Sequence, residues 1–150
     1  MITDHYNRNI DYIRISITDR CNLRCRYCMP EDISFVGHDK ILRYEEITRI
    51  VRILAQRGIT KVKITGGEPL VRHGCTDLIR EIKEIPGIEM VTLTTNGILL
   101  QSMLPKLLEA GVDAVNVSLD TFQRARYEHL TGKDACEMVL AGIQDAYKSG

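Results

Sequence analysis

The chain has 150 residues, and its 20 basic side chains balance its 20 acidic ones. This balance excludes a global positive field that would draw the protein to nucleic acid or to an anionic membrane. No run of about 18 apolar residues exists, so the sequence predicts no membrane span. Residues 1–9 are polar and the cysteine count is odd, at five, so we expect reduced cysteines and a cytoplasmic location.

A predicted strand from Tyr12 to Ile17 leads into a loop that carries Cys21, Cys25 and Cys28. Three thiolates on one short loop can grip a metal centre, but a closed tetrahedral site needs four ligands. The C-x3-C-x2-C spacing differs from the ferredoxin run and lacks the paired C-x2-C units of zinc ribbons. We therefore favour an iron–sulfur cluster in which one iron is free to bind a small molecule.

The alternative is a structural zinc site that a distant side chain completes. The candidates for this fourth ligand are His5, His38, His73, Cys75 and Cys136. On this interpretation the chain is a non-catalytic, zinc-stabilised binding module, and the cysteine spacing alone leaves that interpretation open.

Helical patterns follow the cysteine loop, and each places apolar residues on one face. They cover residues 44–57, 78–85, 103–108 and 134–150. Ser102 is the expected N-cap of the third helix, and Asp134 begins a variant capping box at the start of the last one.

Strand-like stretches alternate with these helices, and each opens with a glycine. They cover residues 58–65, 87–94 and 111–118. Each glycine follows a helical pattern, as expected just past a helix C-terminus. Together with the strand at 12–17, this alternation predicts an α/β fold of parallel strands with right-handed crossovers.

Polar residues alternate with apolar ones along every predicted strand. Arg14, Lys63 and Thr92 are examples, although central parallel strands usually read as continuous apolar runs. Side chains two apart share a face, so the polar set lies opposite the helices. We interpret this as an incompletely closed, TIM-like barrel around a polar ligand. A half-exposed sheet with solvent on one face is the alternative.

Ligands of parallel α/β folds collect at the C-terminal ends of the strands. The cysteine loop follows the first strand, and Gly66-Gly67-Glu68-Pro69 follows the second. Polar residues at 94–97 and 118–120 end the third and fourth strands. The glycine pair lets the backbone approach a ligand closely. We therefore expect the site at this edge of the sheet.

The cysteine loop and the glycine-rich segment together resemble the radical S-adenosylmethionine superfamily. Further motifs extend over nearly the whole chain and resemble the GTP 3',8-cyclase family within it. They are DYIRISITDRC at 11–21, CMP at 28–30, ITGGEPL at 64–70, LTTNG at 93–97 and NVSLD at 116–120. The resemblance implies a partial βα barrel and a lyase of molybdenum cofactor (molybdopterin) biosynthesis. Its product is (8S)-3',8-cyclo-7,8-dihydroguanosine 5'-triphosphate.

The resemblance implies one 4Fe–4S cluster with one non-cysteinyl iron site, where S-adenosylmethionine binds. One-electron reduction of S-adenosylmethionine then gives a 5'-deoxyadenosyl radical, which takes hydrogen from the ribose 3' carbon of GTP. No side chain is required as a catalytic acid or base for this first step. The implied partners are GTP as substrate and a reductant such as flavodoxin or ferredoxin, and a homodimer is allowed. The implied metal ligands are Cys21, Cys25 and Cys28.

The resemblance also assigns the remaining site residues. The S-adenosylmethionine contacts are Tyr27, Gly66, Gly67, Glu68 and Ser118, and the GTP contacts are Arg14, Lys63 and Thr94. The family often has arginine where Lys63 stands. Lysine keeps the charge but loses the planar fork that suits bidentate recognition.

Family members are longer chains, whose second half completes the barrel and carries a second cluster. We expect residues 1–150 to correspond to the N-terminal part, with about four strands. We expect this chain to bind a cluster and S-adenosylmethionine, but not to cyclise GTP alone. A different radical S-adenosylmethionine enzyme, such as one that modifies a peptide, is the alternative within this class. The matches at Arg14, Thr94 and Asp19-Arg20 count against it.

Overall fold

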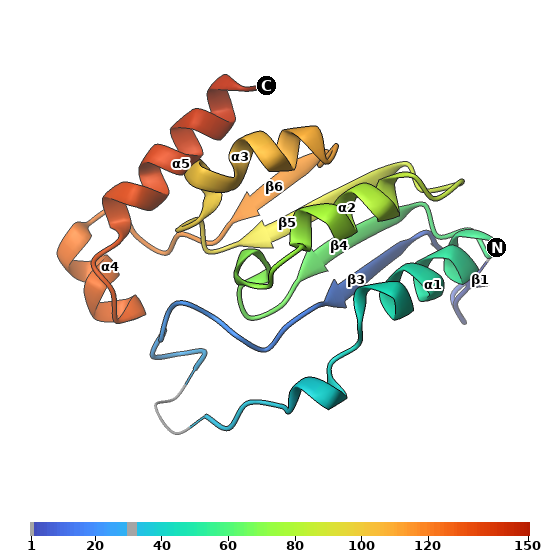
Figure 1. Cartoon of the computed structure of the whole chain (residues 1–150), viewed down its shortest axis with the longest axis horizontal. Helices are drawn as coiled ribbons and strands as arrows, with labels where there is room; N and C mark the ends of the chain where they lie inside the picture. Colours follow the sequence, from blue (N-terminus) through green and yellow to red (C-terminus); the bar gives the residue numbers. More distant parts are fainter. Residues whose placement is uncertain (1, 30–32) are drawn as a thin grey trace.

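The computed structural model describes residues 2–29 and 33–150, and these form a layered α/β domain (Figure 1). The strands are β1 (Ile2–Thr3), β2 (Asn9–Ile10), β3 (Tyr12–Ser16), β4 (Lys61–Thr65), β5 (Met90–Thr95) and β6 (Ala114–Val117). The α-helices are α1 (Tyr44–Ala55), α2 (Cys75–Lys83), α3 (Leu100–Glu109), α4 (Arg124–Thr131) and α5 (Cys136–Lys148). Short 3-10 helices cover His38–Lys40 (η1) and Pro69–Val71 (η2).

A four-stranded parallel sheet in the order β3-β4-β5-β6 forms the centre of the fold. A helix connects each strand to the next parallel strand, and strands that are consecutive in the sequence are adjacent in the sheet. The predicted α/β class and the parallel strands are confirmed. The sheet is open, which agrees with a partial rather than a closed barrel.

The hydrophobic core lies between the sheet and helices α1, α2 and α3, which cover one face of it (Figure 1). Ile64 of β4 and Leu93 of β5 point into this core and have no exposed surface. They meet Val51 of α1 and Leu78 and Ile79 of α2, which are equally buried. Burial of these side chains is the main stabilising contribution to the fold.

The opposite face of the sheet carries the polar members of the alternating pattern. Arg14, Lys63 and Thr92 lie in register on β3, β4 and β5. The described helices α1 to α3 all pack on the apolar face, so the described residues also fit the half-exposed sheet that we considered as the alternative.

Two features of the fold were not predicted from the sequence. Strands β1 and β2 form a small antiparallel hairpin before the main sheet. Helix α4 occupies a segment for which the sequence showed no helical pattern, and it lies beyond the C-terminal ends of the strands (Figure 1).

Both predicted helix caps are wrong. Helix α3 begins at Leu100, so Ser102 lies inside it and its hydroxyl donates to the Leu99 carbonyl. Asp134 does not cap α5, because both of its carboxylate oxygens accept hydrogen bonds from Arg124 of α4. An ion pair between the first residue of α4 and the segment that joins α4 to α5 stands in place of the expected cap.

The glycines that open the repeated stretches behave as predicted. Gly58, Gly87 and Gly111 have positive φ angles of 102°, 94° and 78° and follow α1, α2 and α3. In the part of the chain that the structure describes, no helix has the length and apolar character needed to cross a membrane.

Candidate functional site

The cysteine loop follows β3 and is hydrogen-bonded to the C-terminal end of helix α4. The backbone amides of Arg24 and Arg26 donate to the carbonyls of Thr131 and Leu130, each at 3.0 Å. The amides of Cys28 and Met29 both donate to the carbonyl of Cys25, at 3.0 and 2.9 Å. The loop therefore has a defined turn between its second and third cysteines, although it contains no helix or strand.

The three cysteines are free thiols that differ in exposure. Cys21 and Cys25 are partly buried and Cys28 is exposed. Burial raises the pKa of the Cys25 thiol, and the charges of Cys21 and Cys28 add to this shift. Both other cysteines of the loop thus act electrostatically on Cys25.

Two N–H groups point at the sulfur of Cys21. The backbone amide of Leu23 lies 3.4 Å from Cys21 Sγ, and the side-chain amide of Asn96 lies 3.6 Å from it. Donors around a cysteine sulfur suit a thiolate that binds metal, because they stabilise its negative charge.

The donor set fits an iron–sulfur cluster. No three His, Cys, Asp or Glu side chains among residues 2–29 and 33–150 are grouped so as to hold a single metal ion. A four-iron cluster is larger than one ion, so its cysteine ligands need not converge on one point. Two candidate zinc ligands, Cys75 and Cys136, are each 1% exposed and belong to hydrophobic clusters.

The glycine pair packs against the backbone that leads into the cysteine loop. The amide of Gly67 donates to the carbonyl of Thr18 at 2.6 Å, and the amide of Glu68 donates to that of Arg20 at 2.8 Å. A Cβ atom on Gly66 would lie 2.7 Å from the Thr18 oxygen, and one on Gly67 would collide with the Arg20 carbonyl. The absence of side chains here is required by close packing within the protein itself.

Glu68 is fully buried, with 0% of its surface exposed. Its Oε1 atom accepts from the Leu70 amide at 3.1 Å and the Thr95 hydroxyl at 2.8 Å, and its Oε2 atom accepts from the Asn96 amide at 2.7 Å. Burial raises the pKa of Glu68, and these hydrogen bonds act in the opposite direction. The carboxylate thus joins the ends of β4 and β5.

Tyr27 connects the cysteine loop to the end of β6. Its hydroxyl donates to Asp120 Oδ2 at 2.6 Å, and this hydrogen bond raises the pKa of the phenol above its usual range. The Tyr27 side chain remains 66% exposed, so it is accessible at the mouth of the site. Ser118, two residues before Asp120, is also exposed.

Asn96 and Asp120 were not among the predicted site residues, although both lie in motifs that the sequence made conspicuous. Asn96 is the fourth residue of LTTNG, and Asp120 is the last residue of NVSLD. Their position directly after a strand is the signal that could have identified them.

The three predicted GTP contacts lie on the open face of the sheet. Arg14 and Lys63 are direct partners on adjacent parallel strands. Thr94 lies one strand further, two residues beyond the position that pairs with Lys63, or about 7 Å along the strand. The ion pairs among the described residues include neither Arg14 nor Lys63.

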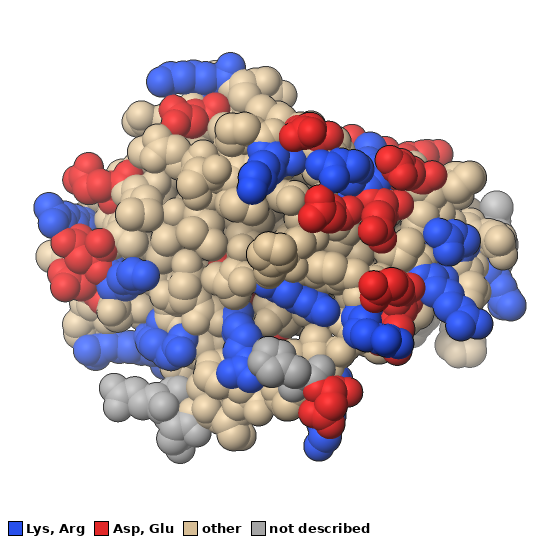
Figure 2. Space-filling model, in the orientation of Figure 1, with Lys and Arg blue, Asp and Glu red and all other residues tan. Residues whose placement is uncertain are grey.

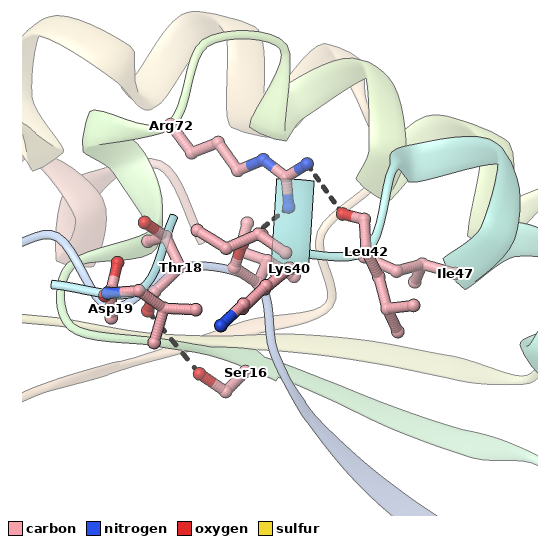
Figure 3. A pocket seen from close by; sticks show the side chains of 10 residues that line it. Ser16, Thr18, Asp19, Lys40, Leu42, Ile47 and Arg72 are labelled. Atoms are coloured by element: carbon pink, nitrogen blue, oxygen red, sulfur yellow. Dashed lines mark hydrogen bonds between the residues drawn. The ribbon is translucent and has the colours of Figure 1, made fainter. Parts of the chain in front are cut away.

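A separate cavity of about 220 Å³ lies beside the end of β3 (Figure 3). Arg72 extends across it and donates to the carbonyls of Ile17 and Leu42. It also stacks on the Tyr44 ring, 4.1 Å from the ring centre. Arg72 thereby fastens the segment that returns from the cysteine loop to α1, and none of the predicted site residues lines this cavity.

The comparison with protein families gives a match over the part of the chain that contains this site. The profile described as "Radical SAM superfamily" matches residues 15–150, which is most of the chain. The chain belongs to the radical SAM superfamily. Its cysteine loop, glycine pair and strand ends are therefore parts of a radical SAM fold.

Curated relatives are similar to the chain at the level of sequence. GTP 3',8-cyclase from Petrotoga mobilis is 49% identical over 148 residues, and that from Pelotomaculum thermopropionicum is 51% identical over 148 residues. Both alignments cover 98% of this chain and 46% of the relative. The chain spans about half the length of the curated relatives it matches.

Solved structures share the fold at lower sequence identity. Streptococcus suis SuiB bound to precursor peptide SuiA matches with a TM-score of 0.74 and 21% identity, over 93% of this chain and 31% of SuiB. HydG, a maturase of the [FeFe]-hydrogenase, matches with a TM-score of 0.71 and 20% identity, over 93% of this chain and 33% of HydG. At such identities the match shows a shared fold and nothing more.

Replacement of Gly67 by alanine tests the packing beneath the cysteine loop. The new methyl group would press on the Arg20 carbonyl, so we expect Gly67→Ala to lower the free energy of unfolding by about 1–3 kcal/mol. Gly37→Ala is the matched control, because its Cβ would meet only the flexible end of the Asp39 side chain. Urea unfolding of the two variants measures the difference, and equal stabilities would contradict the packing argument.

The pH dependence of stability tests the burial of Glu68. Because its pKa is raised in the folded chain, Glu68 binds its proton more tightly there than in the unfolded chain. Its contribution to the free energy of unfolding is therefore full below the unfolded pKa and falls as pH rises through the folded pKa. Glu68→Gln lacks this titration. We expect the stability difference, wild type minus variant, to decrease from pH 4 upward.

Urea titrations of both proteins at matched pH values provide the measurement, and all other titrating groups cancel in the difference. A stability difference that increases with pH would mean that the pKa of Glu68 is lowered in the folded chain. The hydrogen bonds from Leu70, Thr95 and Asn96 would then affect this pKa more than burial does.

Proposed function

We propose that this chain is the cluster-bearing and S-adenosylmethionine-binding part of a GTP 3',8-cyclase. The observation that carries the proposal is the loop of Cys21, Cys25 and Cys28, which is tethered to the ends of the parallel strands and provided with N–H donors. The curated relatives at about half sequence identity are named for this activity, which supports the same reaction for the whole protein.

In this proposal the three cysteines hold a 4Fe–4S cluster and leave one iron for S-adenosylmethionine. A reduced cluster of this kind supplies the electron that starts radical chemistry on the bound S-adenosylmethionine. Tyr27 and Ser118 are accessible beside the loop and serve as contacts for the cofactor. Glu68 is buried, so it acts by holding Asn96 and Thr95 in position rather than by touching a ligand.

Gly67 can bind S-adenosylmethionine only through its backbone amide or its backbone carbonyl. The Gly67 amide already donates to Thr18, so its carbonyl is the group that can still bind a ligand. A carbonyl accepts hydrogen bonds, which suits the ammonium group of a methionine moiety rather than its carboxylate. Gly67 is exposed, which supports this contact.

GTP is the proposed substrate, and the open face of the sheet is its proposed surface. Arg14 and Lys63 offer two neighbouring positive charges that form no ion pair among the described residues. Such a pair of cations favours a polyanion, and a triphosphate is one. Thr94 adds a hydroxyl near the end of the next strand.

The proposed reductant is a one-electron carrier such as flavodoxin or ferredoxin. Basic side chains gather over the stretch between β3 and α1, in the lower part of the molecule (Figure 2). Arg20, Arg24 and Arg26 belong to this stretch. A positive surface next to the cysteine loop would attract an acidic electron carrier. A homodimer remains part of the proposal, to be tested by the mass of the protein in solution.

Anaerobic reconstitution with iron and sulfide tests the proposed cluster. The wild-type chain should bind about four irons and four acid-labile sulfides, and Cys25→Ser should lose most of both. Cys75→Ala is the control and should keep the cluster, because Cys75 is buried in the core. Chemical analysis of iron, sulfide and zinc gives the result. One zinc without sulfide would support the zinc-stabilised module instead.

The reconstituted chain should not cyclise GTP alone, because it lacks cysteine ligands for the second cluster that the family resemblance implies. Three of its five cysteines form the cysteine loop, and the other two lie in hydrophobic clusters. Substantial formation of the cyclised product would contradict this part of the proposal.

Arg14→Ala tests the proposed GTP surface. A charge-assisted hydrogen bond is worth roughly 1.5–3 kcal/mol, so we expect the Kd for GTP to rise by a factor of about ten or more. Arg49→Ala is the matched control, because Arg49 is an exposed arginine of α1, which packs on the apolar face of the sheet. Equilibrium dialysis with GTP measures both, and equal effects of the two substitutions would contradict the assignment.

A further inference from the structure

The side chain of Asn96 lies against the sulfur of Cys21, where β5 ends. Its Nδ2 atom is 3.6 Å from Cys21 Sγ and 2.8 Å from Asn22 Oδ1. Sulfur is larger than oxygen, so 3.6 Å is a contact distance for an N–H···S hydrogen bond. One hydrogen of the amide is thus directed at a cysteine sulfur and the other at the neighbouring amide oxygen.

The orientation of this amide is fixed by its other contacts. Asn96 Oδ1 accepts from the Ile98 amide at 3.1 Å, so the oxygen faces away from the cysteine. The backbone amide of Asn96 donates to the buried carboxylate of Glu68 at 2.7 Å. A flipped amide would place an oxygen on the sulfur and lose the bond to Ile98. The NH₂ group must therefore be the part that meets Cys21.

We propose that Asn96 is a positioning residue that sets the reduction potential of the metal centre through the Cys21 sulfur; this rests on the proposed cluster. Reduction adds negative charge to a cluster and its thiolates, and a hydrogen bond to a thiolate offsets that charge. The Asn96 bond therefore favours the reduced state and raises the potential. Leu23 supplies a second donor from the backbone, which substitution of a side chain leaves in place.

The test compares Asn96→Ala with wild type after anaerobic reconstitution. Redox titration followed by electron paramagnetic resonance measures the reduced and oxidised fractions of the cluster. We expect the ratio of reduced to oxidised cluster at a fixed potential to fall on the order of tenfold, which equals a downward shift of 59 mV for one electron. Asn9→Ala is the control, because Asn9 is an exposed residue of β2; it should leave the potential unchanged.

A second variant separates the loss of the donor from damage to the turn. Asn96→Asp keeps an oxygen that can accept from Ile98 but removes both N–H donors. It should also lower the potential, and more strongly, because it adds a negative charge near the cluster. In both variants the exchangeable-hydrogen coupling of the reduced cluster should weaken when spectra in H₂O and D₂O are compared, whereas Asn9→Ala should retain it.

Iron and sulfide analysis of each protein distinguishes failure of this inference from failure of the proposed function. A loaded Asn96→Ala cluster with the wild-type potential would overturn the inference and leave the cluster proposal intact. If the wild-type chain takes up no cluster, both are wrong. If neither Asn96 variant loads a cluster while Asn9→Ala does, Asn96 is needed for assembly and the tuning role is overturned.

Discussion

The buried carboxylate of Glu68 is the interaction on which the candidate site depends. A glutamate with no exposed surface is costly unless its oxygens are fully hydrogen-bonded. Three donors meet this requirement, and they come from the glycine-rich segment and from the end of β5. One of them is the amide of Asn96, whose side chain reaches Cys21. The buried charge therefore links two strand ends to the first cysteine.

The cysteine loop has no regular secondary structure, but contacts with several strand ends and with helix α4 restrict its conformation. It continues directly from β3, meets β4 through the Gly67 and Glu68 amides, and meets β6 through the bond from Tyr27 to Asp120. Helix α4 supports it from beyond the strand ends. Ordering a loop costs conformational entropy, and these tethers offset that cost during folding rather than during ligand binding. The thiols are thus positioned by tertiary contacts rather than by local helix or strand geometry.

Periodicity predicted the parts of the fold that bury a continuous apolar stripe, such as β4, β5 and α2. It missed helix α4, because Tyr127 and Thr131 are the only residues buried there and most of its other residues are polar. The Asp134 cap was wrong because Arg124, distant in the helical pattern, competes for the carboxylate. The position of Asn96 directly after a strand pointed to the site, but its contacts and the burial of Glu68 could not be predicted. These contacts join segments that are distant in the sequence, 28 residues for Glu68 and Asn96 and 75 residues for Asn96 and Cys21, which no local pattern encodes.

The cations on and beside the sheet differ in whether a carboxylate pairs with them. Lys61 at the start of β4 is paired with Asp11 at 2.7 Å, and Lys83 at the end of α2 is paired with Asp113 at 2.7 Å. Lys63 shares β4 with Lys61 but faces Arg14 in register, with no carboxylate pairing to either among the described residues. Like charges at directly paired positions of adjacent strands repel each other. An anionic ligand on the polar face would relieve this repulsion, which supports the proposal that Arg14 and Lys63 bind GTP.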